Sequence, residues 1–155
     1  DLPRLQTFVT LSPMPRLREW LTHTAADNET KAQTIAELDA KNWQIDPQNK
    51  QVLWPRVMSL LSDYLHAKSL KTESLVDPVA RFHLGNGACV YQLNWPADLS
   101  ENGVGQSYGA MINYLYEPDR IEERHEAYVK DGVIAIDAEL QRTLNKFSAD
   151  AVCAV

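Results

Sequence analysis

The segment from Pro78 to Tyr116 constrains the fold most, because it contains most of the glycines and two runs with strand character. In the first run, Cys89 to Trp95, the residues alternate between two faces. One face is predicted to carry Cys89, Tyr91, Leu93 and Trp95, and the other Val90, Gln92 and Asn94. The second run, Gly109 to Tyr116, alternates in the same way, with Met111, Asn113 and Leu115 opposite Ile112, Tyr114 and Tyr116. The segment therefore predicts two strands joined by a polar connection that is too long for a tight turn.

Polar residues inside these runs raise the question of a site. Asparagine is depleted in strands, so Asn94 and Asn113 together suggest a polar wall. On pattern alone, a solvated hairpin face is the favoured interpretation. Gly85 and Gly87 lie just after His83, where they allow the backbone a positive φ angle. The segment thus predicts a histidine placed before a glycine-rich turn.

The rest of the chain is read mainly as helices. Residues 5–11 have the pattern of a buried strand, and Ser12 falls at its carboxyl end because Pro13 keeps the preceding residue extended. Helical spacing of apolar residues follows in five further segments: from about residue 17, then 27–38, 51–68, from about 118, and 137–147. The expected order is strand, three helices, two strands and two helices, which is an α+β or α/β fold with a mixed sheet flanked by helices.

Composition limits the classes of function. The chain has 155 residues, is 45% hydrophobic and carries a net charge of −6, which predicts a globular domain. A sequence pI near 5.1 and the absence of a basic run argue against nucleic-acid binding. No apolar run approaches the roughly 20 residues of a membrane-spanning helix, and no signal peptide is recognised. Cys89 and Cys153 form neither a disulfide framework nor a zinc site, which favours a reducing, cytoplasmic compartment.

Two residues are candidates for chemistry because of their positions. Ser12 ends a strand and His83 precedes the glycine-rich turn, and such places often lie beside clefts. Each also has a structural explanation: Ser12 as the cap of the next helix, and His83 as a hydrogen-bonded core histidine. No set of His, Cys, Asp or Glu has the spacing of a metal site, so no metal is expected. Gly103, Gly105 and Gly109 do not form a dinucleotide-binding fingerprint.

A resemblance extends the interpretation. The run FVTLSPMP followed by REWL is similar to the strand, turn and helix of malonyl-CoA decarboxylases. The segment after Asp77 resembles that family's most characteristic block, with FHL-x-NGA, N-W-x-A-D, S-x-x-G and N-Y-x-Y. In this chain these motifs are Phe82-His83-Leu84, Asn86-Gly87-Ala88, Asn94-Trp95, Ala97-Asp98, Ser100, Gly103 and Asn113-Tyr114-Leu115-Tyr116. The resemblance covers about residues 5 to 130, and Cys89 and Pro96 depart from it only outside the motif positions.

The resemblance implies a function and a set of site residues. The family converts malonyl-CoA to acetyl-CoA and CO2 without a metal, biotin or another cofactor, on a domain similar to the GNAT acyltransferase fold. Its catalytic serine and histidine fall on Ser12 and His83. The family's further polar positions, expected around the substrate, fall on Asn94, Asp98, Asn113 and Tyr116. The compartment expected for a eukaryotic member is the mitochondrial matrix or the peroxisome.

The resemblance also implies that residues 1–155 form only the carboxyl-terminal part of the catalytic domain. The loop that holds the CoA pyrophosphate in GNAT folds would lie upstream of Asp1, with half of the sheet and a helical domain. A companion chain, a preceding segment or a homo-oligomer would then supply the rest. The strand at 7–11 is therefore expected to have an exposed or partner-filled edge.

Other classes of function stay open. One is a different acyl-CoA enzyme on the same fold, either an acyltransferase or a thioester hydrolase, although no G-x-S-x-G motif surrounds Ser12. Another is a non-catalytic interaction module.

Overall fold

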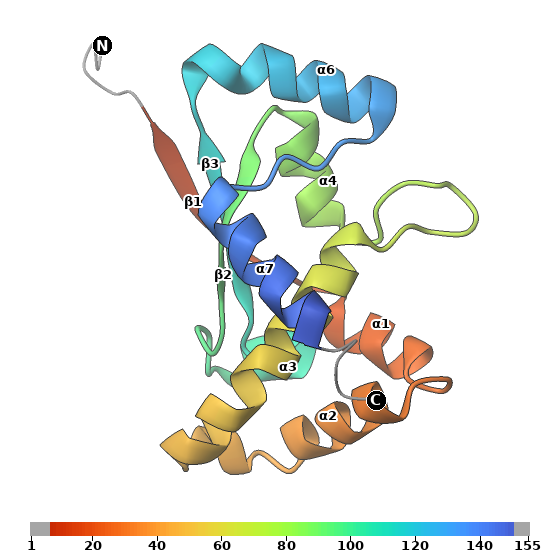
Figure 1. The fold of residues 1–155 in the computed structure, drawn as a ribbon, viewed down its shortest axis with the longest axis vertical. Coiled ribbons are helices and arrows are strands. Elements are labelled where there is room, and N and C mark those ends of the chain that lie inside the picture. Colours follow the sequence, from red (N-terminus) through yellow and green to blue (C-terminus); the bar gives the residue numbers. More distant parts are fainter. Residues whose placement is uncertain (1–6, 151–155) are drawn as a thin grey trace.

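The computed structural model describes residues 7–150, and its central element is a three-stranded sheet (Figure 1). The strands are β1 (Phe8–Pro13), β2 (Cys89–Asn94) and β3 (Met111–Tyr116). They are ordered β1-β3-β2, and both pairs are antiparallel. The expectation of a mixed sheet is therefore wrong for these strands. Parallel pairing occurs as an isolated bridge between Val90 and Ile136.

Strand β2 departs from the predicted alternation. A bulge between Val90 and Gln92 inserts one residue opposite β3, so that Cys89 and Val90 are both buried while Tyr91 is exposed. A bulge shifts the face of every residue that precedes it relative to those that follow. The predicted face of Cys89, Tyr91, Leu93 and Trp95 is therefore wrong at Tyr91. In β3 the alternation holds, since Ile112 and Tyr114 are buried.

The helices that the sequence predicts are present, with shifted ends. Helices α1 (Leu17–Thr24), α2 (Glu29–Asp39) and α3 (Pro47–His66) follow β1, and α6 (Ile121–Asp131) and α7 (Ala138–Asp150) follow β3. Two short 3₁₀ helices, η1 (Asn42–Gln44) and η2 (Pro118–Arg120), lie in the connections. Figure 1 shows α6 at the opposite end of the molecule from α1, α2 and α3.

Two further helices were not predicted. Helix α4 (Pro78–Gly85) begins after Asp77, whose carboxylate accepts hydrogen bonds from the backbone N–H groups of Val79 and Ala80. Helix α5 (Glu101–Ser107) begins after Ser100, whose hydroxyl accepts from the Gly103 N–H group. Both helices are too short for their apolar spacing to show in the sequence, so only their caps indicate them. His83 thus lies in the last turn of α4 rather than in a loop.

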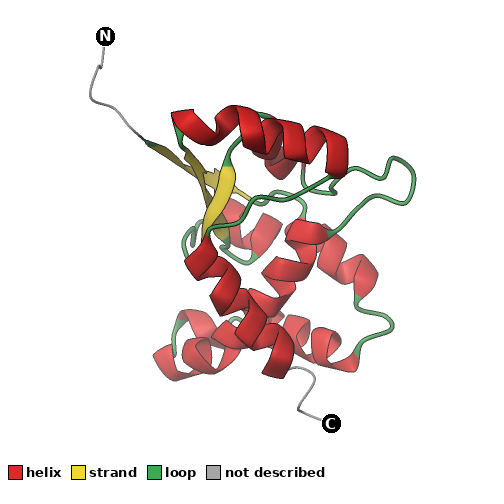
Figure 2. Cartoon of the chain, turned by 45° about the horizontal axis from the view of Figure 1, so that its top comes forward, coloured by secondary structure: helices red, strands yellow, loops and turns green. Residues whose placement is uncertain are grey.

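Helix α3 is the centre of the hydrophobic core. Its buried residues are Leu53, Val57, Met58, Leu60, Leu61, Tyr64 and Leu65, and it packs against α1, α2 and α7. Trp43 of η1 is also buried and packs against Trp95 with ring centroids 5.0 Å apart. Figure 2 shows how the helices gather beside the short sheet. The core therefore joins the helices to the end of β2.

Strand β1 forms one edge of the sheet. Within residues 7–150 it pairs only with β3, and its Phe8, Val9 and Leu11 side chains are exposed by half or more. The expected exposed edge is confirmed. Of the helices in residues 7–150, none combines the length and apolar character needed to cross a membrane.

Candidate active site

His83 is the centre of a hydrogen-bonded group of side chains. Its Nε2 atom lies 3.1 Å from Ser12 Oγ, and its Nδ1 atom lies 2.7 Å from the Tyr116 hydroxyl. These residues come from β1, α4 and β3, and Ser12 and His83 are separated by 71 positions in the chain. Helix capping does not explain Ser12, because its described side-chain contacts are to His83 and Thr10. The predicted proximity of Ser12 and His83 is confirmed.

The strand register explains why these side chains meet. Antiparallel partners share a face, and Thr10 is opposite Tyr114 while Ser12 is opposite Ile112. Tyr116, two residues beyond Tyr114, therefore points to the same face. Helix α4 lies over this face and places the His83 ring against Tyr114, with centroids 4.3 Å apart and planes at 21°. The stacking fixes the ring, and its two nitrogens then reach the two hydroxyls.

The environment of the imidazole favours its neutral form. Partial burial lowers the pKa of His83 below its usual range, and the nearby negative charge of Asp77 opposes this effect. Burial also raises the pKa of the Tyr116 hydroxyl, so this group stays protonated near pH 7. A neutral histidine between two hydroxyls can accept a proton from one side and donate one on the other. The group is therefore able to carry out acid–base chemistry.

Two side chains of this group were not predicted. Thr10 Oγ1 lies 3.1 Å from Ser12 Oγ, and the buried Tyr114 ring stacks on His83. The period of two in a strand could have indicated Thr10, because it lies two residues before Ser12. Nothing in the sequence indicates that Tyr114 contacts the imidazole, since this depends on how α4 packs on the sheet.

The two asparagines lie elsewhere. Asn94 donates a hydrogen bond to the Asn113 side chain at 2.7 Å, and Asn113 donates to the Thr10 carbonyl at 2.8 Å. Asn113 alternates with Ile112 and Tyr114, so it points to the sheet face opposite His83. The expectation that both asparagines share a cavity with His83 is wrong for this structure. A role for them in substrate binding stays a prediction.

Asp98 has a local structural role. Hydrogen bonding to the Ser100 side chain, and then to the Ser100 backbone N–H group, lowers the pKa of the Asp98 carboxylate. Its backbone N–H group donates to the carbonyl of Gly109. These contacts hold the loop before α5, and none of the described hydrogen bonds joins Asp98 to His83. Its assignment to substrate binding also stays a prediction.

The described residues contain no group of three or more His, Cys, Asp or Glu side chains placed to hold a metal ion. Ser12, His83 and Tyr116 on one face of an α+β domain define a candidate acid–base centre.

Comparisons with known proteins identify the family. The protein-family model described as malonyl-CoA decarboxylase C-terminal domain matches residues 1–153 of this chain. A solved malonyl-CoA decarboxylase from Rhodopseudomonas palustris is 40% identical, with a TM-score of 0.83 over 91% of this chain and 34% of that chain. One from Agrobacterium vitis is 33% identical, with a TM-score of 0.84 over 93% of this chain and 37% of that one. The mitochondrial malonyl-CoA decarboxylase of Rattus norvegicus is 32% identical over 75% of this chain and 28% of its own length.

The chain belongs to the malonyl-CoA decarboxylase family, and it corresponds to the family's C-terminal domain. It spans about a third of the length of the curated relatives it matches. The α+β fold predicted from the sequence agrees with the solved structures. The relatives from goose and rat are described as mitochondrial, whereas the predicted cytoplasmic location of this chain stays a prediction.

Proposed function

We propose that this chain contributes Ser12 and His83 to an enzyme that converts malonyl-CoA to acetyl-CoA and CO2. The observation that carries the proposal is the contact of His83 with Ser12 on one side and Tyr116 on the other. Membership of the malonyl-CoA decarboxylase family is the reason for proposing malonyl-CoA as the substrate. The geometry alone is compatible with other acid–base reactions of an acyl thioester.

The chemistry makes specific demands on these residues. When the bond to the carboxylate breaks, CO2 leaves and its electron pair forms an enolate on the thioester. The enolate oxygen needs hydrogen-bond donors, and the carbon needs one proton. In the proposed mechanism the hydroxyl of Ser12 orients the malonyl group or donates to the enolate oxygen. The product forms when the carbon receives the proton.

His83 is the proposed source of that proton. Its pKa is lowered in the free chain, but the carboxylate of a bound malonyl group would favour the imidazolium form. The imidazolium then gives its proton to the enolate carbon and returns to the neutral state. The Tyr116 hydroxyl fixes the ring through Nδ1 and leaves Nε2 directed at Ser12 and the substrate. The reaction consumes one proton, which is restored from solvent.

We further propose that residues 1–155 are the carboxyl-terminal part of a GNAT-like catalytic domain. The exposed edge of β1 and the greater length of the relatives support this proposal. The CoA-binding loop would come from another part of the protein, from a companion chain or from a second copy. No cofactor is required by the proposed mechanism, because the thioester itself stabilises the enolate.

The test measures CO2 release and acetyl-CoA formation by the intact protein, with His83→Ala, Ser12→Ala and the exposed His23→Ala as matched control. We expect His83→Ala to lower kcat by about 10²–10⁴-fold with a smaller effect on KM, and the control to be unchanged. Ser12→Ala should also lower kcat. Full activity of His83→Ala would refute the role of the histidine.

The assay also distinguishes the other classes of function. Transfer of the acyl group to an amine, or release of free CoA without CO2, would indicate an acyltransferase or a thioester hydrolase instead. A covalent malonyl or acetyl group on Ser12, detected by mass spectrometry, would indicate nucleophilic catalysis. Binding of malonyl-CoA without turnover would indicate a non-catalytic module.

A further inference from the structure

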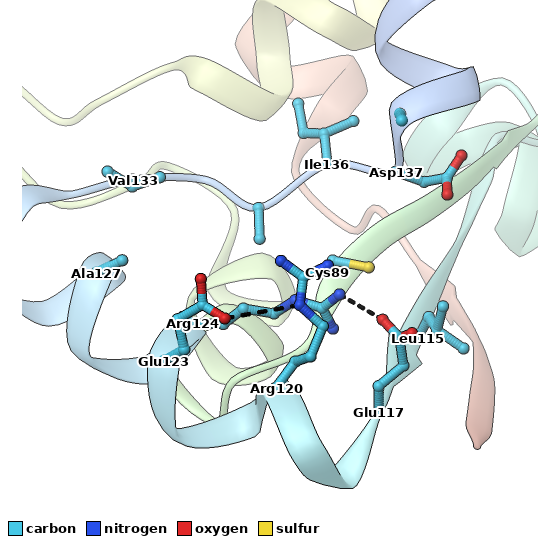
Figure 3. Close-up of a pocket in the computed structure, with 12 residues that line it drawn as sticks. Cys89, Leu115, Glu117, Arg120, Glu123, Arg124, Ala127, Val133, Ile136 and Asp137 are labelled. Carbon is cyan, nitrogen blue, oxygen red and sulfur yellow. Dashed lines mark hydrogen bonds and ion pairs between the residues drawn. The ribbon is translucent and has the colours of Figure 1, made fainter. Parts of the chain in front are cut away.

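A pocket of about 400 Å³ lies between β2, β3, the start of α6 and the segment that leads into α7 (Figure 3). Its size is within the range of pockets that hold small ligands. It shares no lining residue with the group around His83. Its apolar wall is formed by Leu115, Ala127, Val133, Ala135 and Ile136, together with Cys89.

Two arginines line the same pocket, and one is almost fully buried. Arg124 is 8% exposed, and its Nη2 atom forms an ion pair with Glu117. Its Nη1 atom is buried and has no hydrogen-bond partner among the described residues. An unpaired buried N–H group is costly, and more so on a charged guanidinium. Figure 3 shows the Arg124 and Arg120 side chains reaching toward Cys89.

The acidic residues of the pocket already have partners. Glu117 pairs with Arg124, and Glu123 lies 3.6 Å from Arg120. The Asp137 carboxylate accepts from the backbone N–H groups at the start of α7. Among the described side chains that line the pocket, the unmet hydrogen-bonding capacity is therefore that of a donor, Arg124 Nη1, which requires an acceptor. With two arginines and three carboxylates, the lining has a net charge of −1. This charge excludes a ligand with several negative charges, and a single carboxylate has to gain more from the unpaired Arg124 Nη1 than it loses to that charge.

We propose that this pocket binds a small monocarboxylate with a short aliphatic chain. The carboxylate accepts hydrogen bonds from Arg124 Nη1, and the chain lies against Leu115, Val133 and Ile136. A guanidinium is well suited to a carboxylate because its planar N–H groups match the two oxygens. Because Nη1 is buried, a ligand can reach it only from inside the pocket and after a neighbouring side chain has moved. In this proposal the side chain that moves is Arg120, which lines the pocket. That side chain is 53% exposed, and its ion-pair partner among residues 7–150 is Glu123, 3.6 Å away.

The test uses butyrate as the probe, with neutral butyramide and inorganic phosphate for comparison. Binding to the intact protein is followed by titration calorimetry and by the shift in the thermal unfolding midpoint. We expect saturable butyrate binding with a dissociation constant of about 1 mM, the range reached by ligands of this size. Butyramide and phosphate should bind at least about tenfold more weakly, because one lacks the charge and the other carries too much.

Variants locate the site. The pair Arg124→Met and Glu117→Gln is made together, so that no buried charge is left unpaired, and it should weaken butyrate about 10- to 100-fold. Ala127→Leu fills part of the pocket and keeps the charges of Arg124 and Glu117, and it should also weaken butyrate binding. This single variant tests the site independently if the double variant does not fold. Arg142→Met, on the exposed side of α7, is the matched control and should bind normally.

Three results would overturn the proposal. The first is the absence of saturable butyrate binding, which would leave water as the partner of Nη1. The second is binding that Ala127→Leu leaves unchanged, which would place butyrate elsewhere. The third is phosphate binding as tight as that of butyrate.

Discussion

Tyr116→Phe tests whether the tyrosine acts through the histidine. The substitution removes the hydroxyl that lies 2.7 Å from His83 Nδ1 and keeps the aromatic ring. One hydrogen bond between neutral groups contributes about 1 kcal/mol. If the bond is gained between the enzyme–substrate complex and the transition state, its loss lowers kcat about fivefold. The exposed Tyr91→Phe is the matched control and should leave kcat unchanged.

A double-mutant cycle separates this role from direct contact with the substrate. If Tyr116 only positions the imidazole, then Tyr116→Phe should have no further effect in a His83→Ala background. The two losses would then be strongly non-additive. The assay is CO2 release by the intact protein at saturating malonyl-CoA, with unfolding by urea measured in parallel to exclude a general loss of stability. Additive losses would refute the positioning role, and an unchanged kcat in Tyr116→Phe would refute any role of the hydroxyl.

Three further predictions concern stability. Asp77→Ala should lower the free energy of unfolding by about 1–2 kcal/mol in urea, because it removes the buried cap of α4 that accepts two backbone N–H groups, and no change would contradict that role. Gly103→Ala should cost about 1–3 kcal/mol, since a Cβ atom there would lie 2.3 Å from Asp98 Cγ and 2.7 Å from its carbonyl oxygen. Gly105→Ala, with nothing within 4 Å, should instead stabilise the protein by about 0.5–1 kcal/mol, and equal effects at the two glycines would refute the clash. Burial lowers the pKa of His83 in the folded state. The neutral imidazole therefore contributes to the free energy of unfolding above the unfolded-state pKa, and this contribution is lost as the pH falls through the lower folded-state pKa. In urea unfolding, the free energy of unfolding of His83→Gln should thus fall less below about pH 6.5 than that of the parent protein.

The strands and the long helices were predictable because their residues repeat with a clear period. β3 matches its predicted alternation, and α3 matches the spacing of its apolar residues. Helices α4 and α5 were not predicted, since seven or eight residues give too short a pattern and their signals are the caps Asp77 and Ser100. The bulge in β2 has no sequence signal, and it changes which side chains face the core.

The candidate site was predictable in part. The resemblance pointed to Ser12 and His83, and the structure brings them together through α4. It leaves Asn94 and Asn113 on the sheet face away from His83, because Asn113 alternates with Tyr114 in β3 and Asn94 of β2 is opposite Met111. A sequence motif keeps residues together along the chain, whereas the face of a strand residue depends on register. Motif membership alone therefore could not predict which polar residues surround His83.

The position of β3 has a consequence for synthesis of the protein. β3 is the middle strand of the sheet, yet it is the last of the three to leave the ribosome. Among the strands of residues 7–150, β1 and β2 each pair with β3 alone, and Tyr116 at the end of β3 completes the contacts of His83. During translation β1 therefore stays without its partner β3 while about a hundred residues are added. We expect the acid–base centre to form only after β3 has emerged, because His83 takes its Tyr116 contact from that strand.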